Sequence, residues 1–174
     1  MVSSALNETI LTLYRHCRDM PAADFKGWAM ETVQQAVPFD SGVWVTANIV
    51  SESHNSVYLF RQPWEMIENY LRNMSISGDA LAQAVIANPG RTIVADGVIP
   101  RSEFIHSPSY LNHCRLYGME HTLCTSHVAP VTHIVSAISF YRADPNTPFN
   151  ETDRLTKELL TPHLIEAMRI NLFS

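Results

Sequence analysis

Two strand-like segments near the end of the chain, joined by a short turn, restrict its possible folds more than any other feature. Segments 121–129 and 134–141 are rich in β-branched and aromatic residues, and Pro130 begins the turn between them. The pattern predicts an antiparallel hairpin in which Cys124 faces Ser139. The sheet that contains this hairpin is therefore expected to be antiparallel.

Side chains alternate between the two faces of a hairpin, and here the faces differ in bulk. One face carries mostly small residues, namely Thr122, Cys124, Ser126, Val128, Val135, Ala137, Ser139 and Tyr141. The other carries bulkier ones, namely Leu123, Thr125, His127, Ile134, Ile138 and Phe140. Both faces are partly apolar, so the sheet should be covered on both sides. We expect the small face to pack against helices and the bulky face to border a ligand pocket.

The other segments give the element order of an α+β domain. Helical spacing of apolar residues predicts helices at 7–18, 24–37, 63–74, 79–87, 108–116 and from Asn150 or Thr152 to the end. β-branched runs predict strands at 43–50, 56–60 and 92–95, with a turn at 51–55 and a loop at 96–105. We expect a central antiparallel sheet of about five strands, with the N- and C-terminal helices on one face and short helices over the other.

Length, charge and cysteine content limit the function classes. The 174 residues suffice for one domain, spanning 1–174. The net charge is −5 and the 12 Lys and Arg residues form no run, so we expect no direct contact with nucleic acid. The absence of an apolar run of about 20 residues argues against a membrane span. Cys17, Cys114 and Cys124 form no C-x-x-C motif, and no signal peptide is evident, which together favour a cytoplasmic protein.

Three groups of motifs in a fixed order carry a resemblance to a known family. They are FDSGVW at 39–44, SPSY at 107–110 with YGMEHTL at 117–123, and SFYR at 139–142 followed by FNETD at 149–153 and LTPHLIEA at 160–167. Together they resemble the GAF/PAS-like N-terminal sensor domain of LuxR-type bacterial transcriptional regulators. In that family a DNA-binding domain follows, whereas this chain stops at Ser174. Asp79 resembles an acidic position that recurs in the family, and it is also a candidate helix N-cap.

The resemblance implies a sensor domain that binds a small, partly apolar organic molecule and relays its presence through the C-terminal helix. Pro162 should kink that helix or divide it into two, as suits a connector to another domain. No cofactor is indicated. Surplus apolar residues on the terminal helices predict a homodimer, and these are Leu6, Ile10, Leu13, Leu155, Leu159, Leu164, Ile165, Met168 and Leu172.

A ligand pocket is expected between the sheet and the long insertion 63–116. Trp44, Tyr58, Tyr110 and His113 are the predicted lining residues, because they offer flat apolar surface with hydrogen-bonding tips. Other aromatic candidates are Phe60, Tyr70 and Phe140. The alternative is that these side chains simply fill the core.

Histidines and cysteines raise two further possibilities, a metal site and an enzyme. His121, Cys124, His127 and His133 are close in sequence, but an extended strand separates them or turns them to opposite faces, so we expect no metal site. A small enzyme that uses Cys124 and a histidine remains an alternative. The position of Cys124 in the middle of a strand favours a structural role for its thiol over a catalytic one. A dimerisation scaffold without ligand is the other alternative.

Overall fold

The computed structural model describes residues 3–48 and 56–174. Within these ranges, five antiparallel strands form one sheet in the order β2-β1-β5-β4-β3. The strands are β1 (Ser41–Asn48), β2 (Ser56–Phe60), β3 (Thr92–Val94), β4 (His121–Val128) and β5 (Ile134–Arg142). Cys124 of β4 lies opposite Ser139 of β5, as predicted. The predicted turn at 51–55 and the last two residues of the predicted strand 43–50 lie outside the described residues.

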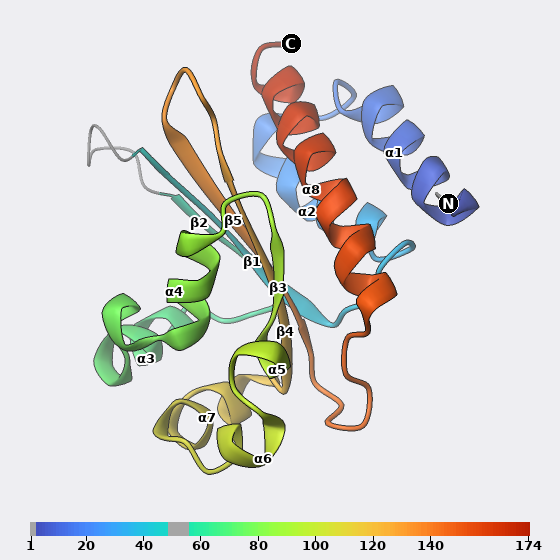
Figure 1. Cartoon of the computed structure of the whole chain (residues 1–174). Coiled ribbons are helices and arrows are strands. Elements are labelled where there is room, and N and C mark those ends of the chain that lie inside the picture. Colours follow the sequence, from blue (N-terminus) through green and yellow to red (C-terminus); the bar gives the residue numbers. More distant parts are fainter. Residues whose placement is uncertain (1–2, 49–55) are drawn as a thin grey trace.

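Helices α1 (Ser4–His16), α2 (Ala22–Val33) and α8 (Glu151–Leu172) cover one face of the sheet (Figure 1). α1 begins earlier than predicted because Ser3, and not Asn7, caps it, accepting the Leu6 N–H at 3.1 Å. Bulky side chains of the helices and the sheet form the main core, among them Leu13, Phe25, Trp44, Leu123, Ile138, Phe140, Leu160 and Leu164.

Short helices cover the other face, in the order α3 (Glu65–Asn73), η1 (Ile76–Gly78), α4 (Ala80–Ala87), α5 (Ala95–Val98), α6 (Arg101–Phe104), α7 (Pro108–Asn112) and η2 (Cys114–Tyr117). The predicted α+β fold, with terminal helices on one face and short helices over the other, is confirmed. The predicted loop at 96–105 is wrong, because the segment forms α5 and α6. A single helical turn is too short to produce a recognisable apolar period.

The roles assigned to the two faces of the β4–β5 hairpin are reversed in the structure. Leu123, Ile138 and Phe140 are fully buried in the core formed with the terminal helices. Cys124 and Ser139 instead face the short helices and border a cavity. The bulky face packs against the long helices because it has the larger apolar area to bury. The small side chains leave unfilled volume on the opposite side.

α8 continues as one helix through Pro162. Asn150 and Asp153 form a capping box that fixes its start. Of the two predicted outcomes, a kink or a division into two helices, the division does not occur. Proline cannot donate a hydrogen bond to the preceding turn, but Thr161 and Leu164 on either side of it are buried in the protein and hold the helix in place.

Lys157 of α8 is fully buried beneath the sheet. Its ammonium group donates to the Thr125 hydroxyl at 2.7 Å and to the Ile138 carbonyl at 2.6 Å, and it lies 4.7 Å from the centre of the Phe140 ring. Burial lowers the pKa of this amine from 10.5 to about 7. Burying a charged ammonium group costs free energy, and no carboxylate among the described residues forms an ion pair with Lys157 to offset that cost.

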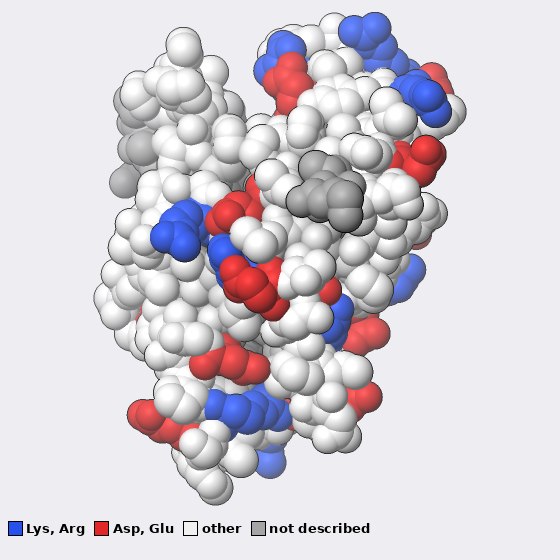
Figure 2. Space-filling view, turned by 45° about the vertical axis from the view of Figure 1, so that its right-hand side comes forward, with Lys and Arg blue, Asp and Glu red and all other residues white. Residues whose placement is uncertain are grey.

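Charged side chains of both signs are mixed on the surface that Figure 2 shows, with wide areas that carry no charge. This face therefore lacks the continuous basic surface that nucleic acid binding requires. In the described part of the chain, none of the helices has the length and apolar character of a membrane span.

The buried amine should make stability depend on pH. Because its pKa is about 7 in the folded protein and 10.5 otherwise, the unfolded chain binds more protons between these values, and stability should rise with pH across that window. Between about pH 7 and pH 8.5, Lys157→Met should remove a slope of at most about 1.4 kcal/mol per pH unit in the unfolding free energy. Urea titrations measure this slope. Arg15→Met, at an exposed cation, should leave it unchanged; equal slopes in wild type and Lys157→Met would contradict the assignment.

Candidate functional site

A cavity of about 400 Å³ lies between the sheet and the short helices. Helices α3 to α7 and the turns η1 and η2 contribute its walls, and β1, β4 and β5 contribute its floor. This is the place where the sequence predicts a pocket, between the sheet and the insertion 63–116. Its volume falls in the range of small-molecule sites.

The floor consists mostly of small and medium side chains at alternate strand positions, namely Val43, Val45, Thr122, Cys124, Ala137 and Ser139, with the larger Tyr141 beside them. The walls are mostly apolar and include Met66, Ile67, Leu81, Val85, Val98, Ile99, Phe104 and Met119. An apolar wall over a floor with scattered hydroxyl groups suits an organic molecule that is apolar over most of its length.

Asp79 brings a carboxylate to the cavity. One of its oxygens accepts the Ala82 N–H at 3.2 Å and so caps α4, as the sequence predicts. The other accepts the Tyr70 hydroxyl at 2.9 Å. Burial, and then the nearby Asp79 charge, raise the pKa of Tyr70, so this phenol stays a donor. Asp79 therefore both starts α4 and places an acceptor at the cavity.

His113 lines the cavity, and its side chain is almost completely buried. Its Nδ1 lies 2.7 Å from Asn69 Oδ1, an acceptor, so Nδ1 carries the proton. Burial lowers the pKa of the imidazole, which leaves the ring neutral near pH 7. Its Nε2 has no hydrogen-bond partner among the described residues.

The two thiols at the cavity are held in their protonated form. Burial raises the pKa of Cys114 to about 12 and also raises that of Cys124. A thiol in this state is a poor nucleophile and a poor metal ligand. Among the described residues, no cluster of His, Cys, Asp or Glu side chains has a metal-binding arrangement.

Of the four predicted lining residues, His113 alone borders the cavity. Trp44 and Tyr58 lie on the opposite face of the sheet, so their prediction as lining residues is wrong. Trp44 pairs with Ile138 across the strands and therefore shares its face. The Trp44 ring lies 6.4 Å from that of Phe25, on α2.

Tyr110 is also outside the cavity lining, and it serves instead to hold the short helices on the sheet. Its hydroxyl donates to Glu120 at 2.8 Å, and Arg101 of α6 pairs with the same carboxylate at 3.0 Å. The next residue, His121, is the first of β4 and lies 3.1 Å from Asp96 of α5. Three helices of the cover, α5, α6 and α7, are thus fastened to two adjacent residues at the start of β4.

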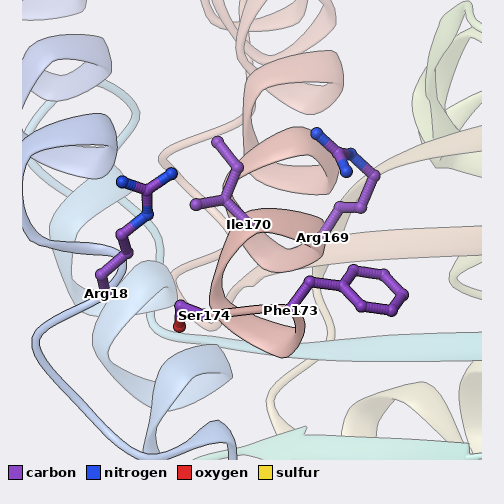
Figure 3. Close-up of a pocket in the computed structure, with 5 residues that line it drawn as sticks. All are labelled: Arg18, Arg169, Ile170, Phe173 and Ser174. Atoms are coloured by element: carbon purple, nitrogen blue, oxygen red, sulfur yellow. The ribbon is translucent and has the colours of Figure 1, made fainter.

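A second, solvent-open depression of about 430 Å³ lies at the end of α8, where Arg18, Arg169, Ile170, Phe173 and Ser174 line it (Figure 3). The Phe173 ring points away from Arg18 in this view, and Arg169 is already paired with Glu166 at 2.6 Å. Its polar groups do not converge on a common point, so it lacks the arrangement of a ligand site.

No protein-family model and no curated protein sequence matches the chain. Solved structures do match its fold. CepR2 from Burkholderia cenocepacia, an N-acylhomoserine lactone dependent LuxR-family transcription factor, has a TM-score of 0.67 at 13% identity, over 97% of this chain and 96% of that one. SdiA in complex with octanoyl-rac-glycerol has a TM-score of 0.63 at 17% identity, over 98% of this chain and 69% of that one.

A phycoerythrobilin-bound GAF domain from a cyanobacterial phytochrome gives a TM-score of 0.60 at 10% identity, over 99% of this chain and 98% of that one. The chain has the GAF-like fold of these proteins. At such low sequence identity the likeness concerns the fold alone. The shared fold confirms the resemblance seen in the sequence. The neighbours are ligand-binding regulatory or sensory proteins.

The raised pKa values of the cavity thiols predict slow thiol labelling. At about pH 8, modification of Cys114 and Cys124 should follow opening of the protein and be about a hundredfold slower than in urea. Peptide mapping after timed reaction with iodoacetamide measures both sites, and Cys124→Ser identifies the Cys124 signal. Labelling of Cys124 at the rate of the unfolded chain would contradict its burial, and labelling faster than that would indicate an activated thiol and favour an enzyme.

Proposed function

We propose that residues 1–174 form the ligand-sensing and dimerisation domain of a bacterial transcriptional regulator of the LuxR type, and not an enzyme. The cavity between the sheet and the short helices is the observation that carries this proposal. A scaffold without ligand would fill this sheet face with its own side chains. An enzyme that uses Cys124 would need an activated thiol, whereas burial raises the pKa of this one.

The chemistry of the cavity favours an uncharged ligand with a hydrogen-bond donor. Among the described residues that line it, none is Lys or Arg, and Asp79 contributes a carboxylate. An anionic headgroup would lose its hydration there without gaining a cationic partner. A hydroxyl or amide N–H could instead donate to Asp79, while an acyl chain packs against the apolar walls. The molecules named for CepR2 and SdiA are of this uncharged, acylated kind.

Calorimetric titration with three probes tests the ligand class. 1-Octanoylglycerol and N-octanoylhomoserine lactone should bind at least about tenfold more tightly than octanoate, because the octanoate charge remains unpaired in the cavity. Ala82→Phe places a ring in the cavity and should weaken binding by about tenfold or more. Ala84→Phe, on the same helix but outside the lining, is the matched control. Binding of neither neutral probe to the wild type, or tighter binding of octanoate, would contradict the proposed ligand class.

Some of the residues predicted for the dimer surface are buried within the single chain. Of the residues predicted for this surface, Leu6, Leu13 and Leu164 are buried in the core of the single chain and are not available to a partner. Leu155, Leu159 and Leu172 of α8, in contrast, are 44%, 52% and 57% exposed. These three remain candidates for a contact between copies.

α1 extends this apolar surface. Leu11 and Tyr14 are exposed on it, and the Tyr14 hydroxyl lies 2.8 Å from Nδ1 of His163, which places the two helices side by side here. Leu11, Tyr14, Leu155 and Leu159 are therefore exposed apolar residues of two helices that contact each other. A two-fold contact between copies that uses both helices would cover these residues in both chains at once.

Sedimentation equilibrium tests the dimer. The wild type should sediment at about twice the 19.6 kDa of one chain at about 10 µM. Leu159→Glu should weaken dimerisation by about tenfold or more, because it places a charge in an apolar interface. Leu71→Glu, at an exposed leucine on α3, is the control and should leave the dimer intact. A monomeric wild type, or equal effects of the two variants, would overturn this part of the proposal.

A further inference from the structure

Thr92, the first residue of the edge strand β3, is held by side chains from outside its own strand at each of its polar groups. Its N–H donates to Glu158 Oε1 at 2.9 Å, and its carbonyl accepts from Arg154 at 3.3 Å. Its hydroxyl lies 2.5 Å from that of Thr125. Thr92 is 1% exposed, and its bond to Thr125 is buried, whereas the bonds to Glu158 and Arg154 are partly buried.

Both backbone partners of Thr92 come from consecutive turns of α8. Arg154 and Glu158 are also paired with each other at 3.3 Å, which fixes their orientation toward the strand. A third α8 residue, Lys157, reaches the same place indirectly, because its ammonium donates to the Thr125 hydroxyl at 2.7 Å. One short strand is thus bonded to α8 directly through two residues and indirectly through a third.

The same strand connects two helices of the cavity wall. α4 precedes it and α5 follows directly at Ala95. Val85 and Ile86 of α4 border the cavity, as do Ala95 and Val98 of α5. A change in the packing of α4 or α5 against the cavity contents can therefore reach β3 along the chain.

We propose that Thr92, Arg154 and Glu158 form the element that couples the occupancy of the cavity to α8. In this arrangement, a ligand that shifts α4 and α5 changes the position of Thr92, and its bonds to Glu158 and Arg154 transfer the shift to α8. The three residues act as positioning residues and do not touch the ligand. The proposal rests on the proposed function, because it takes the cavity as the ligand site.

Hydrogen exchange of the full chain without ligand tests the coupling independently of ligand identity. Val98→Ala alters the cavity wall and should raise amide exchange in α8 near residues 154–162 by about three- to tenfold, the size typical of coupling between packed elements. The same change made together with Glu158→Ala should add nothing to the exchange of Glu158→Ala alone. Glu166→Ala, which removes an α8 ion pair remote from β3, is the matched control and should preserve the full Val98→Ala effect.

Two results would overturn the coupling element. One is unchanged α8 exchange in Val98→Ala, and the other is an effect of Val98→Ala that survives Glu158→Ala at full size. If Glu158→Ala does not fold, Glu158→Met takes its place with the same expectation, because it keeps the length of the side chain and loses both the acceptor for the Thr92 N–H and the ion pair with Arg154. Because no ligand is used, failure of all probes to bind would count against the proposed function and would leave the measured coupling between the cavity wall and α8 unchanged.

Discussion

The packing of one sheet face against the terminal helices is the constraint on which the rest of the structure depends. Trp44, Ile138 and Phe140 fill the space between the sheet and the long helices, and Phe39 stacks on Phe140 with ring centres 4.0 Å apart. Each fully buried side chain of this kind contributes about 1.5–3 kcal/mol. An unfilled cavity costs free energy. The filled face supplies the apolar burial that allows the opposite face to remain open.

Polar residues fix the cover over the open face, since short helices bury little apolar area of their own. Asp79 starts α4 and binds Tyr70 of α3, and Glu120 holds α6 and α7. Each of these carboxylates receives more than one donor, as partly buried charges require. The shape of the cavity therefore depends on a few charge-assisted hydrogen bonds and less on a continuous apolar core.

Sequence patterns predict the fold well because they reflect backbone periodicity, which is local. The register of Cys124 with Ser139, the α4 cap at Asp79 and the position of the cavity under 63–116 all follow from such patterns. They do not determine which sheet face meets the terminal helices. That choice is made by tertiary packing, and it carried Trp44 and Tyr58 to the opposite side from the one predicted.

The remaining site residues are hidden from sequence reasoning for different reasons. Small floor residues such as Ala137 and Ser139 attract no notice, since a site is usually sought among large or titratable side chains. The partners of Thr92 lie more than sixty positions away on α8, at 154 and 158, and only the folded chain brings them together. Tyr110 has the polar tip expected of a lining residue, but its hydroxyl is used by Glu120.

The alternation of bulky and small side chains along β4 and β5 has a consequence for how such a domain can diverge. Within one strand, a position that faces the long helices is confined to side chains that fill the core, while its neighbour on the floor is free to change in size or polarity. Replacing Ala137 or Ser139 would reshape the chamber without touching the packing of Ile138 between them. Residues that would contact a ligand and residues that stabilise the core thus lie on opposite faces of the same strand, so ligand selectivity can change with little loss of stability.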